Sequence, residues 1–333
     1  MEKVLVALSG GVDSSVCAFL LREQGYKVVG ASLLLYDDVN STNIELAIQT
    51  SKYLGIQHLI IDARTEFLNQ IITPFYEAYT KGLTPNPCVM CNRGIKFQRL
   101  LQEANLRDTF YISTGHYARI SDGKLLRGTD THKDQSYVLY RLSHEQILRT
   151  KLPLGELHKD VVRSIASKAG LPTSSAKESH EVCFLKGSSY TGHFKGSKKG
   201  VIRDVKTGQI LGRHNGIEHY TIGQRKRLGI SHPTPLYVVS IEHETNTIYV
   251  GDFDSAHSDI VRVKDINWII KREKDFSADV KIRYTMKPAP AFVSIVDNDS
   301  IVVRFNKPQW APAPGQSAVF YEGDVVIGGG IIY

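Results

Sequence analysis

Short apolar runs alternate with helix-spaced apolar positions through the first 120 residues of the chain. The continuous runs predict four strands, over residues 3–8, 28–35, 58–62 and 110–113. Apolar positions three and four apart predict the intervening helices, over residues 14–24, 44–54, 66–79 and 92–103. Thr42-Asn43-Ile44-Glu45 is typical of a capping box at the start of the second helix, and Gly55 is typical of its end. Strands that alternate with helices indicate an α/β fold with a doubly wound, mainly parallel sheet.

After about residue 200 the pattern changes to short strands at close spacing. Two runs around a polar turn predict a hairpin, over residues 236–241 and 247–251. Further strands are predicted over residues 261–263, 280–284, 292–296, 301–305, 317–321 and 325–332, and prolines are expected to separate them. We therefore expect three domains: an α/β domain over 1–195, a small central domain over 196–257 and an antiparallel β-barrel-like domain over 258–333.

The charge of the chain is concentrated in its middle. The net charge is +7, yet residues 184–233 alone contain ten Lys and Arg and two acids, a net charge of +8. This concentration favours a polyanionic partner, and the alternative is a solvated, lysine-rich surface. No apolar run reaches the ~18 residues of a membrane span, and the first apolar run is too short for a signal peptide. We therefore expect a cytoplasmic protein that does not enter a membrane.

The first predicted strand leads into Ser9-Gly10-Gly11-Val12-Asp13-Ser14, which opens a helix. Glycines there let backbone N–H groups approach an anion, and the helix N-terminus adds partial positive charge. Asp13 could hold Mg²⁺ against phosphates. The motif contains neither the lysine of a Walker A loop nor the three glycines of a dinucleotide-binding loop. It resembles the signature of the PP-loop ATP pyrophosphatases, which implies that ATP is cleaved between its α and β phosphates and a substrate oxygen is adenylated.

Four cysteines are too few for a disulfide scaffold in a chain of 333 residues, so we expect core residues, metal ligands or reactive thiols. Cys88 and Cys91 lie in a proline-containing loop that ends at a predicted helix start, where a thiolate is favoured. Cys183 lies far from them in sequence, and Cys17 falls on the apolar stripe of the first helix. Thiols combined with an adenylation motif indicate sulfur chemistry.

Further motifs identify a family that the chain resembles over essentially its whole length, the bacterial tRNA-specific 2-thiouridylases. The matching blocks are Ser9–Ser14, Thr84–Asn92, Thr114–Tyr117, Lys133–Tyr137, Val182–Phe184, Thr221–Lys226, Arg283–Tyr284 and Pro314–Tyr321. The resemblance implies an adenine nucleotide α-hydrolase-like first domain. It also implies a sulfurtransferase that adenylates O2 of the first anticodon uridine, replaces that oxygen with sulfur and releases AMP.

The resemblance also implies roles for particular residues. The ATP-binding residues would be Ala7, Leu8, Ser9, Gly10, Gly11, Val12, Asp13 and Ser14, with Leu33 and Gly115 near the adenosine. A persulfide would form on Cys183, and Cys91 would release its sulfur and close a Cys91–Cys183 disulfide. The target base would contact Asn86, Pro87 and Cys88. The tRNA would contact His116, Lys133, Asp134, Gln135, Arg283, Tyr284 and Gln316, and the positive charge of Arg225, Lys226 and Arg227 suits its phosphates.

The partners implied are tRNAs of the lysine, glutamate and glutamine type, together with a cysteine desulfurase or a sulfur-carrier protein. The chain departs from the family at Cys88, where the better-known form carries Asp, and at His180-Glu181-Val182, where it carries Thr-Gly-Ile. Cys88, Cys91 and Cys183 could therefore ligate a [4Fe–4S] cluster instead of using a persulfide.

Two other functions remain open from the residues alone. One is a PP-loop ligase of the argininosuccinate or amidating type, acting on a small acid, which would need neither the basic segment nor the cysteines. The other is an RNA-binding protein without catalysis, which conflicts with the intact motif at Ser9–Ser14.

Overall fold

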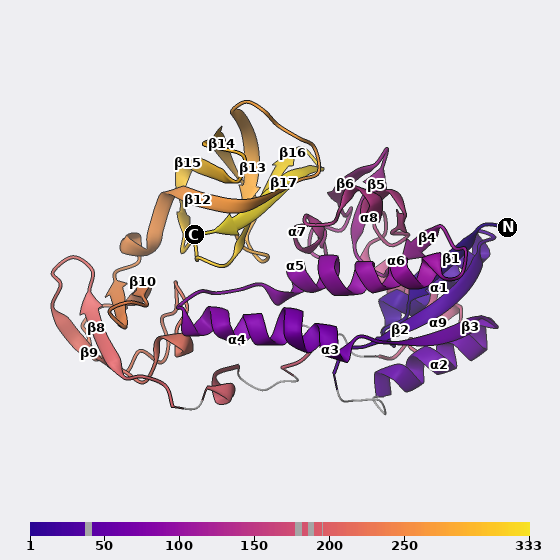
Figure 1. Ribbon diagram of the computed structural model, residues 1–333, viewed down its shortest axis with the longest axis horizontal. Helices are drawn as coiled ribbons and strands as arrows, with labels where there is room; N and C mark the ends of the chain where they lie inside the picture. The colour runs from indigo at the N-terminus through magenta and orange to yellow at the C-terminus, as the bar shows by residue number, and fades with distance from the viewer. Residues whose placement is uncertain (37–41, 177–181, 186–189, 195) are drawn as a thin grey trace. The chain divides into compact units, whose positions relative to one another are not determined.

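The computed structural model describes residues 1–36, 42–176, 182–185, 190–194 and 196–333 (Figure 1). The chain forms two compact units, each assembled from segments that are distant in sequence. The first comprises Met1–Ile71, Cys88–Phe184 and Glu322–Ile327. The second comprises Ile72–Pro87, Leu185–Tyr321 and Gly328–Tyr333. No helix in the described ranges has the length and apolar character needed to cross a membrane.

The first unit is built on a five-stranded sheet with the order β3-β2-β1-β4-β7. Its strands are β1 (Lys3–Ala7), β2 (Lys27–Leu34), β3 (Gln57–Asp62), β4 (Tyr111–Ser113) and β7 (Thr150–Lys151). All four neighbouring pairs are parallel. The predicted doubly wound parallel sheet is therefore confirmed. β7 was not predicted, because a strand of two residues leaves no periodic signal.

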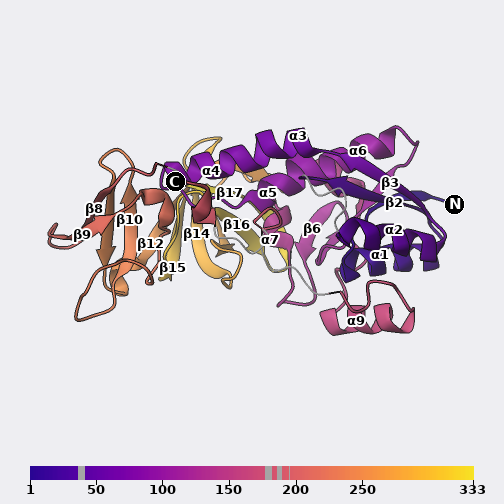
Figure 2. The ribbon, with the colours of Figure 1, turned by 90° about the horizontal axis from the view of Figure 1, so that it is seen from below.

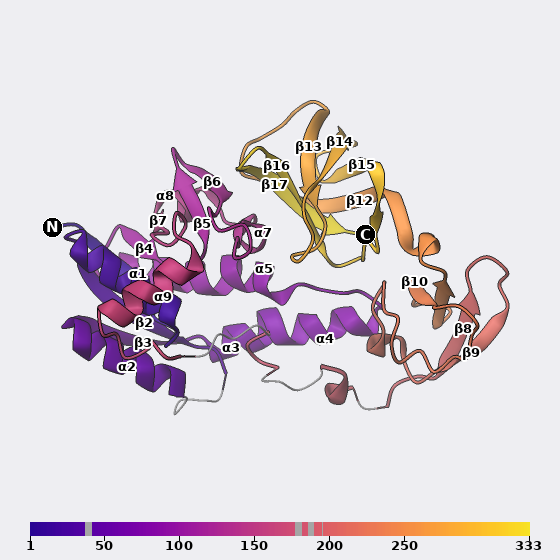
Figure 3. The ribbon, with the colours of Figure 1, turned by 180° about the vertical axis from the view of Figure 1, so that it is seen from behind.

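Helices cover both faces of this sheet. On one face lie α1 (Val12–Glu23), α2 (Thr42–Leu54) and α9 (Lys159–Lys168), and α1 and α9 pack side by side (Figure 3). On the other face lies α6 (Gln98–Asn105), which contacts β1 and β4 (Figure 2). The core on the α1 side includes Val4, Val6, Val16 and Val162. This layering leaves the carboxyl ends of the strands open to loops, where α/β proteins place their ligands.

Both long helices predicted between strands contain π-helical turns. Residues 64–80 form α3 (Arg64–Phe67), η1 (Leu68–Ile72) and α4 (Thr73–Thr80). Residues 87–105 form α5 (Pro87–Cys91), η2 (Asn92–Phe97) and α6. The short elements between β4 and α9 were not predicted: β5 (Ala118–Ser121), β6 (Lys124–Arg127), α7 (Ser136–Leu139) and α8 (His144–Leu148).

The second unit contains a four-stranded sheet with the order β10-β11-β8-β9. The predicted hairpin is present as β10 (Tyr237–Glu242) and β11 (Thr247–Gly251). β8 (Gly200–Asp204) and β9 (Ile210–His214) were not predicted; they complete the sheet through a parallel β11–β8 pairing. Short 3₁₀ turns flank it: η3 (Tyr190–His193), η4 (Ile217–His219) and η5 (Asp254–Ala256).

The remaining strands close into a six-stranded antiparallel barrel. They are β12 (His257–Trp268), β13 (Phe276–Lys281), β14 (Ala289–Ile295), β15 (Ser300–Trp310), β16 (Ser317–Glu322) and β17 (Val325–Ile332). The barrel closes because β12 pairs with both β15 and β17. Two prolines expected to separate strands lie inside them, Pro290 in β14 and Pro308 in β15. Pro308 is accommodated because the β12–β15 register shifts there, between Ser258 and Ile260.

Candidate active site

The loop from β1 to α1 has the shape of an anion cradle. Gly10 adopts a φ of +75°, and a Cβ atom at this position would lie 2.0 Å from the Asn43 carbonyl oxygen, so only glycine fits. Gly11 is extended and caps α1 without a side-chain hydrogen bond. The Ser14 hydroxyl accepts from the Ser9 amide at 3.2 Å and donates to the Gly11 carbonyl at 3.0 Å. The serines therefore fix the loop, and the first N–H groups of α1 point out of the helix.

Asp13, in the first turn of α1, is held by Lys159, which the sequence pattern did not indicate, and by Tyr117, to which the sequence pattern gave no role. Its Oδ1 accepts from Lys159 Nζ at 2.6 Å and from the Tyr117 hydroxyl at 2.7 Å. Lys159 and Tyr117 are 9% and 3% exposed. Asp13 was predicted to hold Mg²⁺, but its charge is already matched by a buried ammonium. The carboxylate therefore does not form a magnesium site as it stands, and we derive no step through a metal bound there.

The other predicted nucleotide residues lie at the same edge of the sheet. Ala7 ends β1, and Leu33 lies one residue before the end of β2. Gly115 follows β4, and a Cβ atom on it would lie 2.9 Å from both the Asp13 carbonyl carbon and the Ser14 nitrogen. The segment after β4 therefore lies directly against the phosphate loop.

Two of the cysteines lie on one continuous helix. Cys88 and Cys91 are one turn apart in α5, which continues directly into the π-helical η2. Cys91 is buried, Cys88 is half-buried and Cys183 is exposed in a turn, where the neighbouring Phe184 packs edge-on against Phe67 at 5.8 Å. A π-helical turn is rare and is frequent at functional sites. The charges of Cys88 and Cys183 raise the pKa of Cys91, and the charge of Cys88 raises that of Cys183, so the three thiols interact electrostatically.

Lys96 on η2 supplies the positive charge for these thiols, and it was not predicted because a lone lysine in a helix carries no signal. Burial raises the pKa of Cys91 to about 12, while the Lys96 ammonium opposes that rise. Desolvation by surrounding protein raises the pKa of Cys183 as well, and Lys96 again opposes it. Burial lowers the pKa of Lys96, and the three neighbouring thiols raise it when they ionise, so that its net shift is upward. Lys96 therefore favours whichever thiol ionises.

His116 connects this charge to the phosphate loop. Its Nδ1 lies 2.7 Å from the Thr114 hydroxyl, and its ring lies 5.9 Å from the Phe97 ring. Burial first, and the charge of Lys96 second, lower the pKa of His116 to about 3. A neutral imidazole can donate or accept a hydrogen bond but adds no charge for RNA phosphates. His116 was predicted as a tRNA contact, and any such contact would be a neutral one.

The cluster hypothesis finds no support in these positions. Within the described ranges, no three side chains of the types His, Cys, Asp and Glu are placed so that they could hold one metal ion. None of the four cysteines forms a disulfide, and Cys17 is a core residue whose pKa burial raises to about 12. We therefore derive no step through an iron–sulfur cluster. His180 and Glu181, at which the chain departs from its relatives, lie outside the described residues.

Several predicted tRNA contacts serve the fold with their side chains instead. In the first unit, Asp134 accepts from the Gly128 amide at 2.9 Å and from the Ser136 hydroxyl at 2.9 Å. Gln135 accepts from the Tyr117 amide at 2.9 Å. These side chains shape the loop after β6. The backbone of this loop and the side chain of Lys133 could still contact RNA. The prediction that Asp134 and Gln135 contact tRNA stays a prediction.

In the second unit, Arg283 and Gln316 act as braces. The Arg283 guanidinium donates to the carbonyls of Ile222 and Ala311 at 2.8 Å and 2.7 Å. Gln316 donates to the Thr84 carbonyl at 2.7 Å, in the segment that leads to Asn86 and Pro87. Both residues are half-buried, and the prediction that they contact tRNA stays a prediction. Tyr284 is 40% exposed and keeps its ring accessible.

Arg225, Lys226 and Arg227 are exposed on one loop of the second unit. Hydrogen bonds of Gly223 and Gln224 with Val238, at 2.8 Å and 3.0 Å, close the neck of this loop. Arg225 and residues 227–236 line a concave space of about 620 Å³. The positive charges of the loop are therefore presented on a fixed frame. Lys186 and Lys195, which also belong to the basic stretch 184–233, lie outside the described residues.

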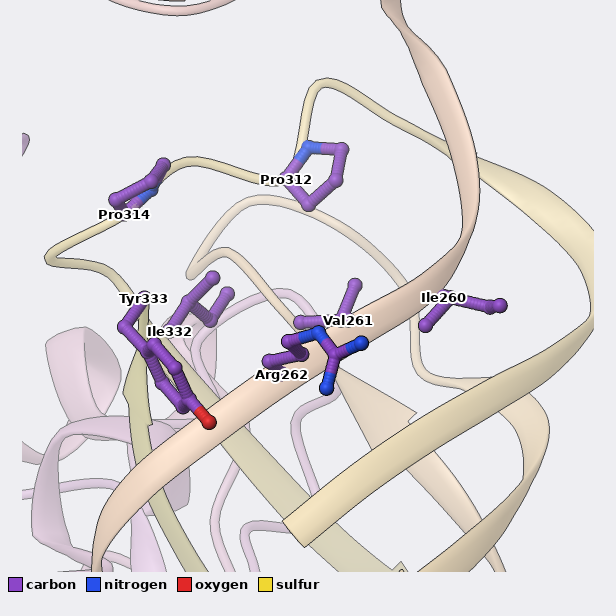
Figure 4. A pocket seen from close by; sticks show the side chains of 7 residues that line it. All are labelled: Ile260, Val261, Arg262, Pro312, Pro314, Ile332 and Tyr333. Carbon is purple, nitrogen blue, oxygen red and sulfur yellow. The ribbon is translucent and has the colours of Figure 1, made fainter. Parts of the chain in front are cut away.

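A second cavity, of about 230 Å³, lies on the C-terminal barrel (Figure 4). Prolines and aliphatic side chains surround Arg262 and Tyr333 there. Its lining consists of Ile260, Val261, Arg262, Pro312, Pro314, Ile332 and Tyr333. None of the residues predicted to act in catalysis or binding is among them.

Three family models match consecutive parts of the chain. Residues 2–187 match the tRNA methyl transferase HUP domain, residues 188–252 the tRNA methyl transferase PRC-barrel domain and residues 258–332 the aminomethyltransferase beta-barrel domain. The chain is 42% identical to tRNA-specific 2-thiouridylase MnmA 1 of Caldanaerobacter subterraneus subsp. tengcongensis, over 99% of this chain and 98% of that protein. It is 43% identical to tRNA-specific 2-thiouridylase MnmA of Carboxydothermus hydrogenoformans, over 99% and 97% of the two chains. The chain has an ATP-using nucleotide domain, a helix and a turn that carry the thiols, and similarity along its whole length, and it therefore belongs to the tRNA-specific 2-thiouridylase MnmA family.

Proposed function

We propose that this chain is a tRNA 2-thiouridylase that uses ATP to exchange O2 of the first anticodon uridine for sulfur. One observation carries the proposal. The short segment Thr114–Tyr117 touches both halves of the chemistry: Gly115 lies against the phosphate loop, Tyr117 binds Asp13, and His116 lies within the field of Lys96 beside the thiols. An adenylated base formed at the loop would therefore lie near the sulfur carrier.

The first step is adenylation. The uridine O2 bonds to the α-phosphorus of ATP, the bond from that phosphorus to the bridging oxygen breaks, and pyrophosphate leaves with the electron pair. The backbone N–H groups at the start of α1 stabilise the phosphate charge. We expect Mg²⁺ to arrive bound to the phosphates as part of the substrate, since Asp13 is engaged by Lys159.

The second step is sulfur transfer. The terminal sulfur of a Cys183 persulfide attacks C2 of the base, and AMP leaves with the former O2. Cys91 then attacks Cys183 Sγ, the sulfur–sulfur bond breaks towards the base, and 2-thiouridine forms together with a Cys91–Cys183 disulfide. A thiol reductant must supply two electrons to restore the thiols.

The exposure of the cysteines suits this division of roles. Cys183 is exposed, so a cysteine desulfurase or a sulfur-carrier protein can reach it, whereas Cys91 is buried and shielded from other oxidants. Because burial raises the pKa of Cys91, its attack depends on the Lys96 charge that opposes this rise. Cys88 would then contact the base with Asn86 and Pro87, and the absence of an acid at position 88 leaves proton transfer to another group.

Binding of tRNA would rest on the second unit. Arg225, Lys226 and Arg227 offer three exposed charges for phosphates, and the exposed Tyr284 offers a ring on which an unpaired base can stack. The target uridine must leave its stack to reach the thiols. We expect tRNAs of the lysine, glutamate and glutamine type as substrates.

The test measures pyrophosphate release and nucleoside composition on the same samples. Purified protein with ATP, a cysteine desulfurase, cysteine and unmodified tRNA should release pyrophosphate only when tRNA is present and should yield 2-thiouridine by mass spectrometry. Pyrophosphate release without tRNA, stimulated by a small acid, would instead identify a ligase. Binding of tRNA without any pyrophosphate release would identify a non-catalytic RNA-binding protein.

A further inference from the structure

The phosphate loop provides no positive charge of its own. Its only charged side chain is Asp13, which alone would repel a triphosphate. The charge beside it comes from Lys159, 146 positions further along the chain. Its ammonium lies 2.6 Å from Asp13 Oδ1 and 5.5 Å from the centre of the Tyr117 ring.

Lys159 is fixed from both ends. Its backbone amide donates to Asp130 Oδ2 at 3.0 Å at the first position of α9. Its side chain is 11% exposed, so the ammonium has little contact with water. A buried cation is unfavourable unless it is paired, and the paired Asp13 lies in the turn of α1 where the N–H groups face an anion. The ion pair with Asp13 therefore also places the Lys159 ammonium beside the phosphate loop.

We propose that Lys159 binds the phosphates of ATP and that Asp13 positions it there. This inference rests on the ATP-using reaction proposed above. As the bond between the α-phosphorus and the bridging oxygen breaks, negative charge grows on the leaving pyrophosphate, and the ammonium stabilises it. Lys159 thus supplies from α9 the cation that a Walker A loop carries within its own sequence.

A purely structural role predicts something different. If Lys159 only neutralised Asp13, its removal would harm ATP binding by leaving a buried carboxylate without its partner, and removal of both charges would repair the damage. If Lys159 binds phosphate, removal of both charges leaves ATP without its cation. The two explanations therefore separate in the double variant Asp13→Asn/Lys159→Met.

The experiment measures the Kd of ATP by calorimetry and tRNA-dependent pyrophosphate release. The variants are Lys159→Met, Lys159→Arg, Asp13→Asn and the double variant. Lys168→Met removes an exposed charge from the other end of α9 and serves as the control. We expect Lys159→Met and the double variant to bind ATP roughly 10- to 100-fold more weakly, the scale of removing one charge-assisted hydrogen bond. Lys159→Arg should weaken binding less, and Lys168→Met should match the wild type.

Wild-type ATP affinity in Lys159→Met, or its recovery in the double variant, would overturn the inference. If Lys159→Met does not fold, as thermal melting would show, the double variant still decides, since it buries no unpaired charge. A wild-type protein that binds ATP but releases no pyrophosphate with tRNA would refute the proposed function. The comparison of ATP affinities would still decide the role of Lys159.

Discussion

Gly115 lies so close to Ser14 that a Cβ atom on Gly115 would stand 2.9 Å from the Ser14 nitrogen. Two segments separated by about a hundred residues of sequence thus meet without space for a methyl group. Because Gly115 packs against the phosphate loop, the shape of this loop depends on the segment that also carries His116 and Tyr117. Nucleotide binding and thiol chemistry are therefore mechanically linked through one short connection after β4.

Gly115→Ala should impair adenylation. The added methyl group must displace the backbone of Asp13 and Ser14, and a displacement near 1 Å at a reacting group can lower the rate ~100-fold. We expect tRNA-dependent pyrophosphate release to fall by a factor of roughly 10 to 100 while tRNA affinity stays within about twofold. Gly192→Ala is the matched control, because nothing lies within 4 Å of the position that its methyl group would take. Equal rates for the two variants would show that the loop tolerates the shift.

Replacement of Arg225, Lys226 and Arg227 by alanine should weaken tRNA binding and reduce its dependence on salt. Each phosphate interaction that the replacement removes should lower the slope of log K against log salt by somewhat less than one. The control removes the same charge from exposed lysines of the barrel region, Lys271, Lys274 and Lys287. An unchanged slope in the loop variant would show that these residues form a solvated surface and do not bind tRNA phosphates.

The sequence predicted the elements whose patterns are local and periodic. β1 to β4 and the barrel strands are repeated apolar runs, and the glycines and serines of the motif at Ser9–Ser14 indicate a phosphate-binding loop. Lys96 and Lys159 could not be predicted in this way. Each is one lysine in a helix, and its importance comes from thiols or a carboxylate brought to it by the fold.

For Arg283 and Gln316 the sequence did not show which groups their side chains bind within the fold. Both belong to motifs that match the family, and both were predicted as RNA contacts, yet their side chains hold backbone carbonyls in place. A motif shows that a residue type is needed at a position; burial and hydrogen-bond partners decide whether it is needed for the ligand or for the loop that meets the ligand.

Lys96→Met should make the thiols harder to ionise. The ammonium lowers the pKa values of Cys91 and Cys183 against burial, so its removal should move both pKa values further upward. The rate of Cys183 alkylation by iodoacetamide, followed by peptide mass spectrometry, should therefore rise at higher pH than in the wild type. Each pH unit of displacement corresponds to about tenfold in rate at a fixed neutral pH. Lys96→Arg keeps the charge and should retain most of the wild-type profile; identical profiles for Lys96→Met and wild type would exclude this electrostatic role.

Cysteine variants should separate the two half-reactions. Cys91→Ser and Cys183→Ser should abolish 2-thiouridine formation yet leave tRNA-dependent pyrophosphate release within about twofold, since serine conserves the side-chain volume and lies outside the phosphate loop. Cys17→Ala is the control, because that thiol is buried in the core against Ser113 and takes no part in sulfur transfer. Loss of pyrophosphate release in the Cys91 and Cys183 variants would contradict the division into two steps.

Cys88→Ser distinguishes a persulfide from an iron–sulfur cluster. With a persulfide on Cys183, position 88 only contacts the base, so the variant should be slower but active. With a cluster, the variant would retain two protein thiolates and should be inactive, because three thiolates are the fewest that hold a cubane with one open iron. The measurement is 2-thiouridine formation by protein purified without oxygen, either iron-free with a cysteine desulfurase or reconstituted with iron and sulfide, alongside the visible spectrum. We expect full activity of the iron-free wild type and residual activity of Cys88→Ser. Activity that requires the reconstituted absorbance, and that disappears in Cys88→Ser, Cys91→Ser and Cys183→Ser alike, would refute the persulfide route.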